Sequence, residues 1–135
     1  MAHDIYYYSF MVTRRQINQL ARCIAEDFRP ERIILFGSYA YGKPTDESDV
    51  DLLVVMNVDG DVVEKGAEIY VAVDKAGAAC FSFDVLVRTP EQLHERIALN
   101  DFFIREITEQ GKVIYESAHA GMGRKGRKGL PQRIS

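Results

Sequence analysis

Residues 32–54 read RIILFGSYAYGKPTDESDVDLLV. The apolar runs at residues 32–36 and 49–56 have the length and composition of buried β-strands. Residues 37–48, between them, are rich in glycine, serine, proline and aspartate, which is typical of a loop that a brief helical turn can open. We therefore expect two buried strands joined by a loop of small and polar residues.

Helical and extended patterns surround this centre. Apolar residues at helical spacing, preceded by a Thr13–Gln16 capping box, predict the first helix, and Thr89-Pro90 predicts the start of a later one. In chain order, the expected elements are helix 12–28, strand 32–36, strand 49–56, helix 62–78, strand 81–87, helix 90–99, helix 101–110 and edge strand 112–115. This order predicts an α/β (α+β) class, with a small mixed β-sheet and flanking helices.

Composition excludes several classes of protein. The chain has 135 residues, of which 47% are apolar and 27% charged, so we expect a globular domain rather than a disordered or coiled-coil chain. No run of 18 apolar residues occurs, which argues against a transmembrane helix, and the N-terminus lacks the basic leader of a secretory signal. Cys23 and Cys80 suggest buried thiols in a reduced compartment, so we expect a cytoplasmic protein.

Charge is unevenly distributed along the chain. The formal net charge is −3, yet residues 117–135 hold five basic and no acidic residues, which leaves −8 on residues 1–116. We expect a domain over residues 1–116, followed by a basic, glycine-rich, disordered tail over residues 117–135. We expect no membrane partner. Because binding to nucleic-acid phosphates needs surplus cations, we also expect no direct nucleic-acid binding by the domain. Contact with RNA through the basic tail is the remaining possibility.

Gly37-Ser38 follows directly after the first strand. Glycine lets the backbone approach a ligand closely, and a following helical turn would direct N–H groups and the Ser38 hydroxyl at a phosphate. The alternative is an ordinary strand-to-helix turn. Residues 37–43 also satisfy the first seven positions of a P-loop, but Pro44 stands where the metal-binding hydroxyl belongs and disfavours the helix that a P-loop requires.

Asp49 and Asp51 begin the second strand. A period of two places both carboxylates on one face, about 6–7 Å apart, while Val50 faces the core on the other side. Two neighbouring carboxylates repel each other, so they need a cation or a raised pKa to coexist. Mg²⁺ commonly binds one or two carboxylates together with substrate phosphates. The alternative is a solvated start of a strand.

Asp84 lies within an otherwise apolar strand, between Phe83 and Val85. Charged residues are rarely buried without a partner, and a strand beside Asp49 and Asp51 would bring three carboxylates together. Three carboxylates suit a two-metal site for in-line phosphoryl displacement. The alternative is a partly exposed carboxylate on an edge strand.

The spacing of these features closely resembles a known family. The sequence GSYAYG at residues 37–42, followed by SDVDLLV at residues 48–54, resembles the G-S-x-A-x-G…S-D-x-D-L signature of DNA polymerase beta-like nucleotidyltransferases. The chain length resembles the minimal branch of that superfamily, and the order of elements fits over residues 17–116. The resemblance implies the nucleotidyltransferase fold.

This resemblance implies a role for each candidate site residue. Gly37 and Ser38 would hold the terminal phosphates of a nucleoside triphosphate. Asp49 and Asp51 would bind divalent metal, and Asp84 would be the third metal ligand or the base for the acceptor hydroxyl. The implied cofactors are two Mg²⁺ ions, for which Mn²⁺ could substitute, and the implied substrate is ATP.

One position departs from the family pattern, because many members have arginine where this chain has Tyr41. The missing cation would weaken the hold on the phosphates, and we expect Lys43 to compensate. Tyr41 therefore favours a binding subunit over an enzyme, while the three aspartates favour an enzyme.

The favoured function is transfer of a nucleoside monophosphate, AMP from ATP, onto an acceptor hydroxyl. The chain leaves few residues for a separate substrate domain, so another chain is expected to complete the acceptor site. By resemblance to the minimal branch, that chain is a helical HEPN-type RNase toxin modified on tyrosine, and this protein is its antitoxin. The alternatives are a non-catalytic antitoxin that neutralises its partner by contact, and a metal-dependent nuclease, which leaves Gly37-Ser38 without a role.

Overall fold

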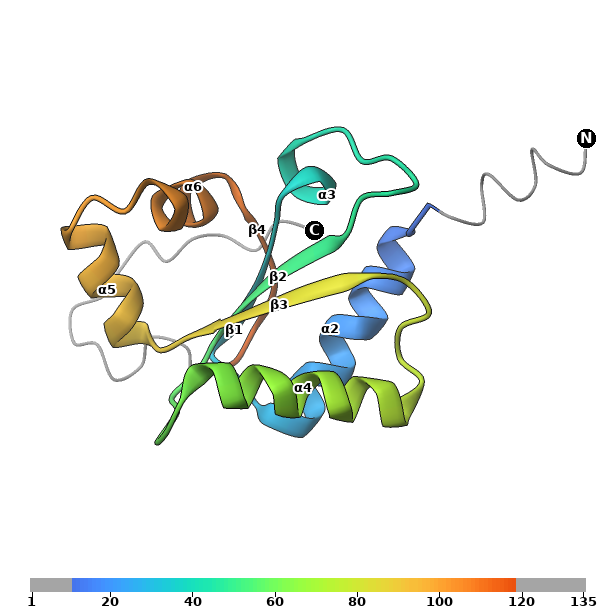
Figure 1. Cartoon of the computed structure of the whole chain (residues 1–135), viewed down its shortest axis with the longest axis horizontal. Helices are drawn as coiled ribbons and strands as arrows, with labels where there is room; N and C mark the ends of the chain where they lie inside the picture. The colour runs from blue at the N-terminus through green and yellow to red at the C-terminus, as the bar shows by residue number, and fades with distance from the viewer. Residues whose placement is uncertain (1–10, 119–135) are drawn as a thin grey trace, which may run out of the picture.

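The computed structural model describes residues 11–118, which form a mixed sheet with helices on both faces (Figure 1). In chain order the elements are α2 (Arg14–Phe28), β1 (Arg32–Phe36), α3 (Ser38–Tyr41), β2 (Val50–Val55), α4 (Val62–Ala76), β3 (Phe83–Arg88), α5 (Pro90–Ala98), α6 (Phe102–Gln110) and β4 (Lys112–Glu116). This order confirms the predicted one. α4 ends two residues earlier than expected because Gly77 takes a left-handed conformation, with φ 63°.

The strand order in the sheet is β3-β2-β1-β4. β1 is antiparallel to both β2 and β4, whereas β2 and β3 run parallel and are connected through α4. Parallel neighbours need such a crossover because the chain must return to the same end of the sheet before the next strand begins. The predicted mixed sheet and the edge position of the last strand are confirmed.

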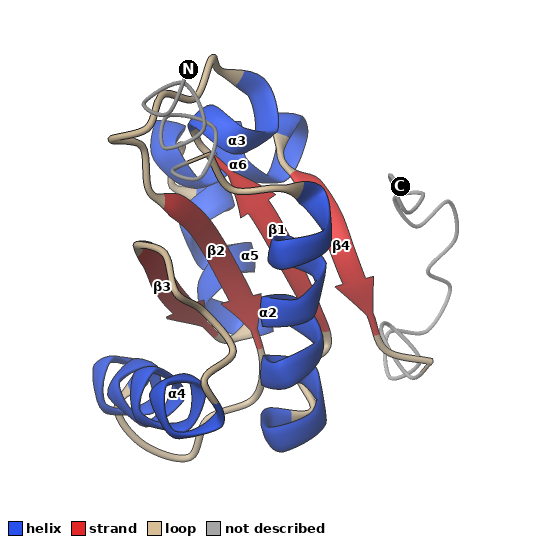
Figure 2. Cartoon of the chain, turned by 90° about the vertical axis from the view of Figure 1, so that its right-hand side faces the viewer, coloured by secondary structure: helices blue, strands red, loops and turns tan. Residues whose placement is uncertain are grey.

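Helices cover both faces of the sheet (Figure 2), and β2 supplies core residues to each face. α2 and α4 pack on the face that carries Val50, Leu52 and Val54. α6 packs on the opposite face, which carries Leu53 and Val55. Within β2, Asp51 is the one side chain that is not fully buried. The central strand therefore holds a single charged residue among apolar ones.

Two capping boxes fix the starts of α2 and α5. Thr13 Oγ1 accepts a hydrogen bond from the Gln16 N–H at 3.1 Å, and Gln16 Oε1 accepts one from the Thr13 N–H at 2.8 Å. Thr89 and Gln92 repeat this exchange, with both distances at 3.0 Å. The Thr13–Gln16 capping box and the helix start at Thr89 were predicted, and both are confirmed; such caps typically contribute about 1 kcal/mol each.

Some expectations concern residues outside the described range, and one is wrong. The basic tail is described only as far as residue 118, so its disorder stays a prediction. Within residues 11–118, no helix is long and apolar enough to cross a membrane. Burial was expected for both cysteines, but Cys23 is only half-buried and Cys80 is exposed, because Cys80 lies in the loop between α4 and β3 rather than in an element.

Gly111 joins α6 to β4 at a point where a side chain has no room. A Cβ at this position would overlap the carbonyl oxygen of Ile107 and lie 2.6 Å from Ile34 Cγ2. The φ of Gly111, −67°, is ordinary for any residue, so the restriction is steric alone. We expect Gly111→Ala to lower the free energy of unfolding by about 1–3 kcal/mol, because overpacking forces its neighbours apart.

Urea unfolding measures this loss, and Gly60→Ala is the matched control. A Cβ on Gly60 would meet nothing within 4 Å, so its substitution should change the free energy of unfolding by less than about 0.5 kcal/mol. Equal stabilities of the two variants would contradict the packing of α6 against β1 and β4.

Candidate active site

The parallel register of β2 and β3 brings two of the predicted carboxylates side by side. Asp51 on β2 pairs directly with Asp84 on β3. Asp49 lies two residues before Asp51 and therefore points to the same face of the sheet. This end of β2 lies next to α3, the short helix that follows β1 (Figure 1). The fold thus gathers segments from three strands at one end of the sheet.

Asp51 shows the electrostatic effect of this crowding. Partial burial raises its pKa from an ordinary 3.8 to about 6, and the charges of Asp84 and Asp49 contribute in the same direction. Because both neighbours act on Asp51, the three carboxylates form one electrostatic group. A proton or a cation on this group would relieve the repulsion.

Gly37 brings the backbone against Asp51. It follows β1 with φ 75° and ψ −155°, a conformation that residues with a side chain rarely adopt. A Cβ on Gly37 would overlap Asp51 Oδ2, so only glycine lets the chain pass this carboxylate. Ser38 then begins α3, and the N–H groups of Ser38 and Tyr39 have no acceptor inside the helix. The Gly-Ser turn and the carboxylates therefore belong to one site.

The loop before β2 is closed by a hydroxyl group. Ser48 Oγ accepts a hydrogen bond from the Thr45 N–H at 2.8 Å, and the Ser48 N–H donates to the Thr45 carbonyl at 3.0 Å. The two bonds form a tight turn immediately before Asp49. Ser48 therefore sets the direction in which the chain enters β2.

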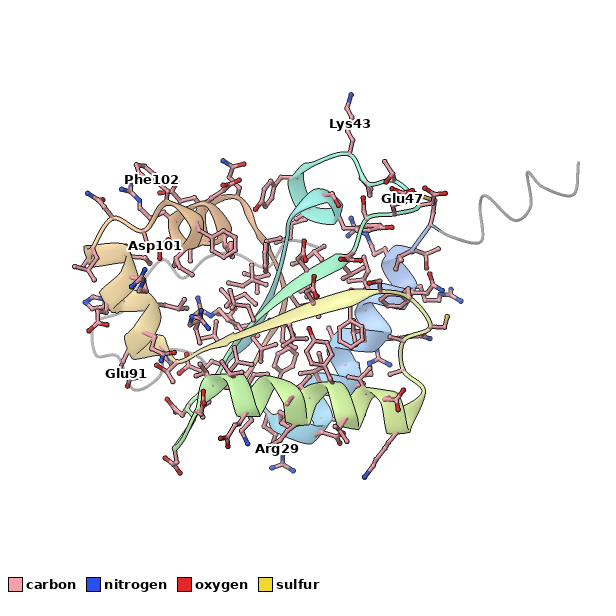
Figure 3. The ribbon with its side chains drawn as sticks, in the orientation of Figure 1. Arg29, Lys43, Glu47, Glu91, Asp101 and Phe102 are labelled. Atoms are coloured by element: carbon pink, nitrogen blue, oxygen red, sulfur yellow. The ribbon has the colours of Figure 1, made fainter. Side chains whose placement is uncertain are left out.

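Lys43 is the predicted site residue that the structure does not bring to the others. It is exposed, and Figure 3 shows its side chain pointing away from the strands, at the tip of the loop that follows α3. Pro44 favours an extended backbone at Lys43, which carries the chain outward. The cation expected to replace the arginine missing at Tyr41 is therefore not beside the carboxylates in this conformation.

Asp84 is exposed, because β3 is an edge strand. The alternative of an exposed carboxylate on an edge strand therefore describes the surroundings of Asp84 correctly. The register still places Asp84 opposite Asp51. An exposed carboxylate beside a partly buried one gives the site one side open to incoming molecules.

Tyr70 on α4 is a neighbour of the site that no sequence pattern indicates. Its hydroxyl oxygen accepts a hydrogen bond from the Val85 N–H at 2.8 Å, and its ring centroid lies 5.1 Å from that of Phe83. Phe83 and Val85 flank Asp84, so Tyr70 contacts β3 on both sides of this carboxylate. Burial raises the pKa of Tyr70, and the nearby aspartates add to that effect. The helical pattern of α4 predicts only that Tyr70 follows the buried Ile69, and it does not predict the contact with β3.

The carboxylates offer the hard oxygen donors that a divalent cation prefers. Within residues 11–118, no three His, Cys, Asp or Glu side chains are close enough to hold a metal ion by themselves. Mg²⁺ commonly takes only one or two carboxylates, with substrate phosphates completing its shell. Asp51 and Asp84, with Asp49 nearby, therefore fit a cation that arrives with a phosphate-bearing substrate.

The candidate site borders an open hollow rather than a closed pocket. A cavity of about 260 Å³ has Ser48, Asp49 and Ser82 in its lining. The larger cavity, of about 650 Å³, lies between α2 and β4 and contains none of the predicted site residues. The residues with the appropriate chemistry, rather than the volume of a cavity, identify the candidate active site.

Comparisons with known proteins agree with this geometry. A family model described as nucleotidyltransferase domain matches residues 17–115. A protein of Methanocaldococcus jannaschii described as a putative protein adenylyltransferase is 38% identical over 88 residues, which span 64% of this chain and 80% of that protein. The crystal structure of a putative nucleotidyltransferase from Sulfolobus solfataricus shares the fold, with a TM-score of 0.53 at 16% identity over 78% of this chain and 82% of that one. A toxin-antitoxin crystal structure with AMP-PNP aligns with a TM-score of 0.49 at 20% identity, over 76% of this chain and 74% of that chain.

The contact between Gly37 and Asp51 predicts a coupled effect of substitution. We expect Gly37→Ala to lower the free energy of unfolding by about 2 kcal/mol, because it combines an unfavourable backbone conformation with a steric overlap. In an Asp51→Ala background the same substitution should cost about 1 kcal/mol less, since the overlapping carboxylate is gone. A double-mutant cycle by urea unfolding measures the difference, and strict additivity would contradict the contact.

The raised pKa of Asp51 predicts that the metal-free protein loses stability as pH rises. Between the unfolded pKa of 3.8 and the folded value of about 6, the native state holds the extra proton, so the free energy of unfolding falls through this window. Asp51→Asn should therefore be more stable than the wild type at pH 7.5, by about 1–2 kcal/mol after allowance for screening. Near pH 4 the difference should vanish. Denaturant unfolding with chelator at both pH values checks this, and a pH-independent difference would disprove the electrostatic cause.

Proposed function

Because the chain belongs to the nucleotidyltransferase domain family and is a nucleotidyltransferase, we propose that it transfers AMP from ATP to a tyrosine hydroxyl of a partner protein. The observation that carries this proposal is the pairing of Asp51 with Asp84 beside the Gly37 turn. Nucleotidyl transfer requires a place for the phosphates and a place for the cations that accompany them. The turn and the carboxylates supply these two places side by side.

In the proposed reaction, the acceptor oxygen attacks the α-phosphorus of ATP, the bond from that phosphorus to the bridging oxygen breaks, and pyrophosphate leaves. The acceptor proton passes to Asp84, whose exposed carboxylate an incoming hydroxyl can reach. Divalent ions held by Asp49, Asp51 and Asp84 would offset the negative charge that develops on the phosphate oxygens. Such transfers depend on positioning and electrostatics, so the site needs no nucleophilic side chain of its own.

The Gly37–Ser38 turn is proposed to hold the terminal phosphates. Its first N–H groups have no acceptor in α3, and the Ser38 hydroxyl adds a further donor. The closeness of Gly37 to Asp51 would keep the phosphates within reach of carboxylate-bound cations. A phosphate contact by Lys43 would require its loop to turn inward from the conformation described.

A protein acceptor fits the openness of the site. The family domain matches residues 17–115, which leaves no second domain among the described residues to enclose an acceptor. The relative of Methanocaldococcus jannaschii is described as a putative protein adenylyltransferase, which supports a protein acceptor here. The resemblance to antitoxin-like minimal nucleotidyltransferases supports a helical HEPN-type RNase as that acceptor, with this chain as its antitoxin and Mg²⁺ or Mn²⁺ as cofactor.

The alternative is an antitoxin that silences its partner by contact alone. Tyr41 in place of arginine and the outward orientation of Lys43 favour this alternative, because they leave the phosphates short of cations. The three grouped aspartates favour catalysis, because a mere contact surface has no need of carboxylates that repel each other.

We expect the wild-type chain with Mg-ATP to add AMP units to tyrosines of a cognate HEPN-type partner, and the RNase activity of that partner to fall as they accumulate. Asp51→Asn and Asp84→Asn should reduce the transfer rate by about 100-fold or more, since each removes a charge that acts in the transition state. Intact-mass spectrometry of the partner, together with an RNase assay, measures both effects.

Two controls separate catalysis from contact. Glu47→Gln removes a carboxylate from the neighbouring loop without touching the Asp51–Asp84 pair and should transfer AMP at a normal rate. Chelation of divalent ions should stop transfer by the wild type. If the RNase is silenced while its mass stays unchanged, the chain acts by contact and the transferase proposal fails.

A further inference from the structure

Large apolar side chains are exposed where α5 meets α6. We call this group the junction patch; it comprises Ile97, Leu99, Phe102 and Phe103, which are 41%, 67%, 82% and 53% exposed. Figure 3 shows Phe102 projecting outward at the start of α6. Clustered exposed apolar side chains on a globular domain mark contact sites for other proteins. Isolated exposed residues would carry no such meaning, but these four lie within seven positions of the sequence.

The fold does not require the junction patch. α6 is anchored on the sheet by Ile104 and Ile107, which are 2% and 0% exposed. Asp101 caps the helix by accepting hydrogen bonds from the N–H groups of Phe103 and Ile104. With the anchor and the cap in place, the phenyl ring of Phe102 contributes little to the core. The packing of the domain therefore gives no reason for an aromatic side chain at this exposed position.

The junction patch is continuous with the candidate active site. The Phe103 ring packs edge-to-face on Phe36, with 5.8 Å between centroids and 83° between planes. Phe36 directly precedes Gly37 and pairs with Asp51 across β1 and β2. A protein that covers Phe103 therefore lies next to the carboxylates.

The charges around the patch indicate what it contacts. Arg96 is paired with Asp101 at 2.9 Å, and Arg105 with Glu109 at 3.5 Å. The exposed Glu106, one helical turn after Phe102, makes no ion pair with any residue in the range 11–118. The same holds for Glu95, one turn before Leu99. The patch thus presents apolar groups beside unneutralised negative charge.

We infer that the junction patch docks the acceptor protein through a face that combines apolar and cationic side chains, and that this contact sets the acceptor hydroxyl beside Asp51 and Asp84. This inference rests on the proposed function. A second copy of the chain is the less suitable occupant, because a two-fold contact would bring the unpaired carboxylates of both copies together. It would also cover the open side of both active sites.

The test compares two highly exposed apolar residues on different elements of the domain. Phe102→Ser in the full chain should raise the KM for the cognate HEPN-type partner by about tenfold or more, as loss of an aromatic contact does at interfaces. Its kcat and its affinity for Mg-ATP should stay within about twofold of the wild type, because the Phe102 side chain is 82% exposed and is not one of the candidate site residues. Val63→Ser is the matched control, since Val63 on α4 is 74% exposed and should leave all three quantities unchanged.

A charge reversal tests the second half of the inference. Glu106→Lys should raise the same KM severalfold at low salt, and the difference from the wild type should shrink at high salt because the interaction is between exposed charges. A KM for Phe102→Ser equal to that of Val63→Ser would overturn the docking site. A Glu106→Lys variant with wild-type KM would overturn the cationic face.

Failure of the docking site and failure of the proposed function give different results. If the wild type adds no AMP to the HEPN-type protein, the proposed function fails. The docking site is then tested by calorimetry: Phe102→Ser should bind that protein more weakly than Val63→Ser does, and equal affinities would overturn the docking site. If the wild type neither modifies nor binds it, the inference is overturned. Sedimentation of the chain alone supplies the last outcome: a dimer that Phe102→Ser dissociates would assign the patch to a second copy and overturn the inference.

Discussion

The pairing of β2 on both of its edges is the constraint on which the rest of the structure depends. Antiparallel pairing with β1 places Phe36 opposite Asp51, and parallel pairing with β3 places Asp84 opposite the same residue. A slip of one position against β1 would turn Asp51 toward the apolar face covered by α2 and α4, and a slip of β3 against β2 would remove Asp84 from its place opposite Asp51. The apolar side chains that β2 buries on both faces fix these registers and, through them, the site.

The site itself opposes folding in two ways. The carboxylate of Asp51 is crowded by two neighbours of like charge, and the backbone of Gly37 takes a conformation that most residues avoid. Burial on both faces of β2 offsets these local penalties, as is common where a rigid scaffold holds a functional site. The bond from the Val85 N–H to Tyr70 adds support on the outer edge of β3, beside Asp84.

Local patterns predicted most elements of the fold, because capping boxes, apolar periodicity and turn residues act over a few positions. The period of two sufficed to place Asp51 on one face with the preceding aspartate. The position of Asp84 depended on which strands become neighbours, and its exposure depended on which strand ends at the edge; tertiary packing decides both. The contact of Tyr70 with β3 and the outward orientation of Lys43 could not be predicted, because tertiary packing decides them too. Only Pro44, which favours an extended backbone at Lys43, is a local signal for that orientation. The order of helices also left open which apolar side chains of α6 face the sheet.

The pairing of the first strand with the last has a consequence for how the chain is made. β1 is covered on one edge by β2, which follows it closely, but its other edge waits for β4, whose Glu116 pairs with Arg32. During synthesis on the ribosome, an apolar strand with one open edge therefore exists for as long as it takes to make the remainder of the domain. Such an edge is a template for pairing with other chains. Any nascent or truncated chain that lacks β4 therefore keeps the candidate-site aspartates but leaves this edge of β1 exposed to aggregation.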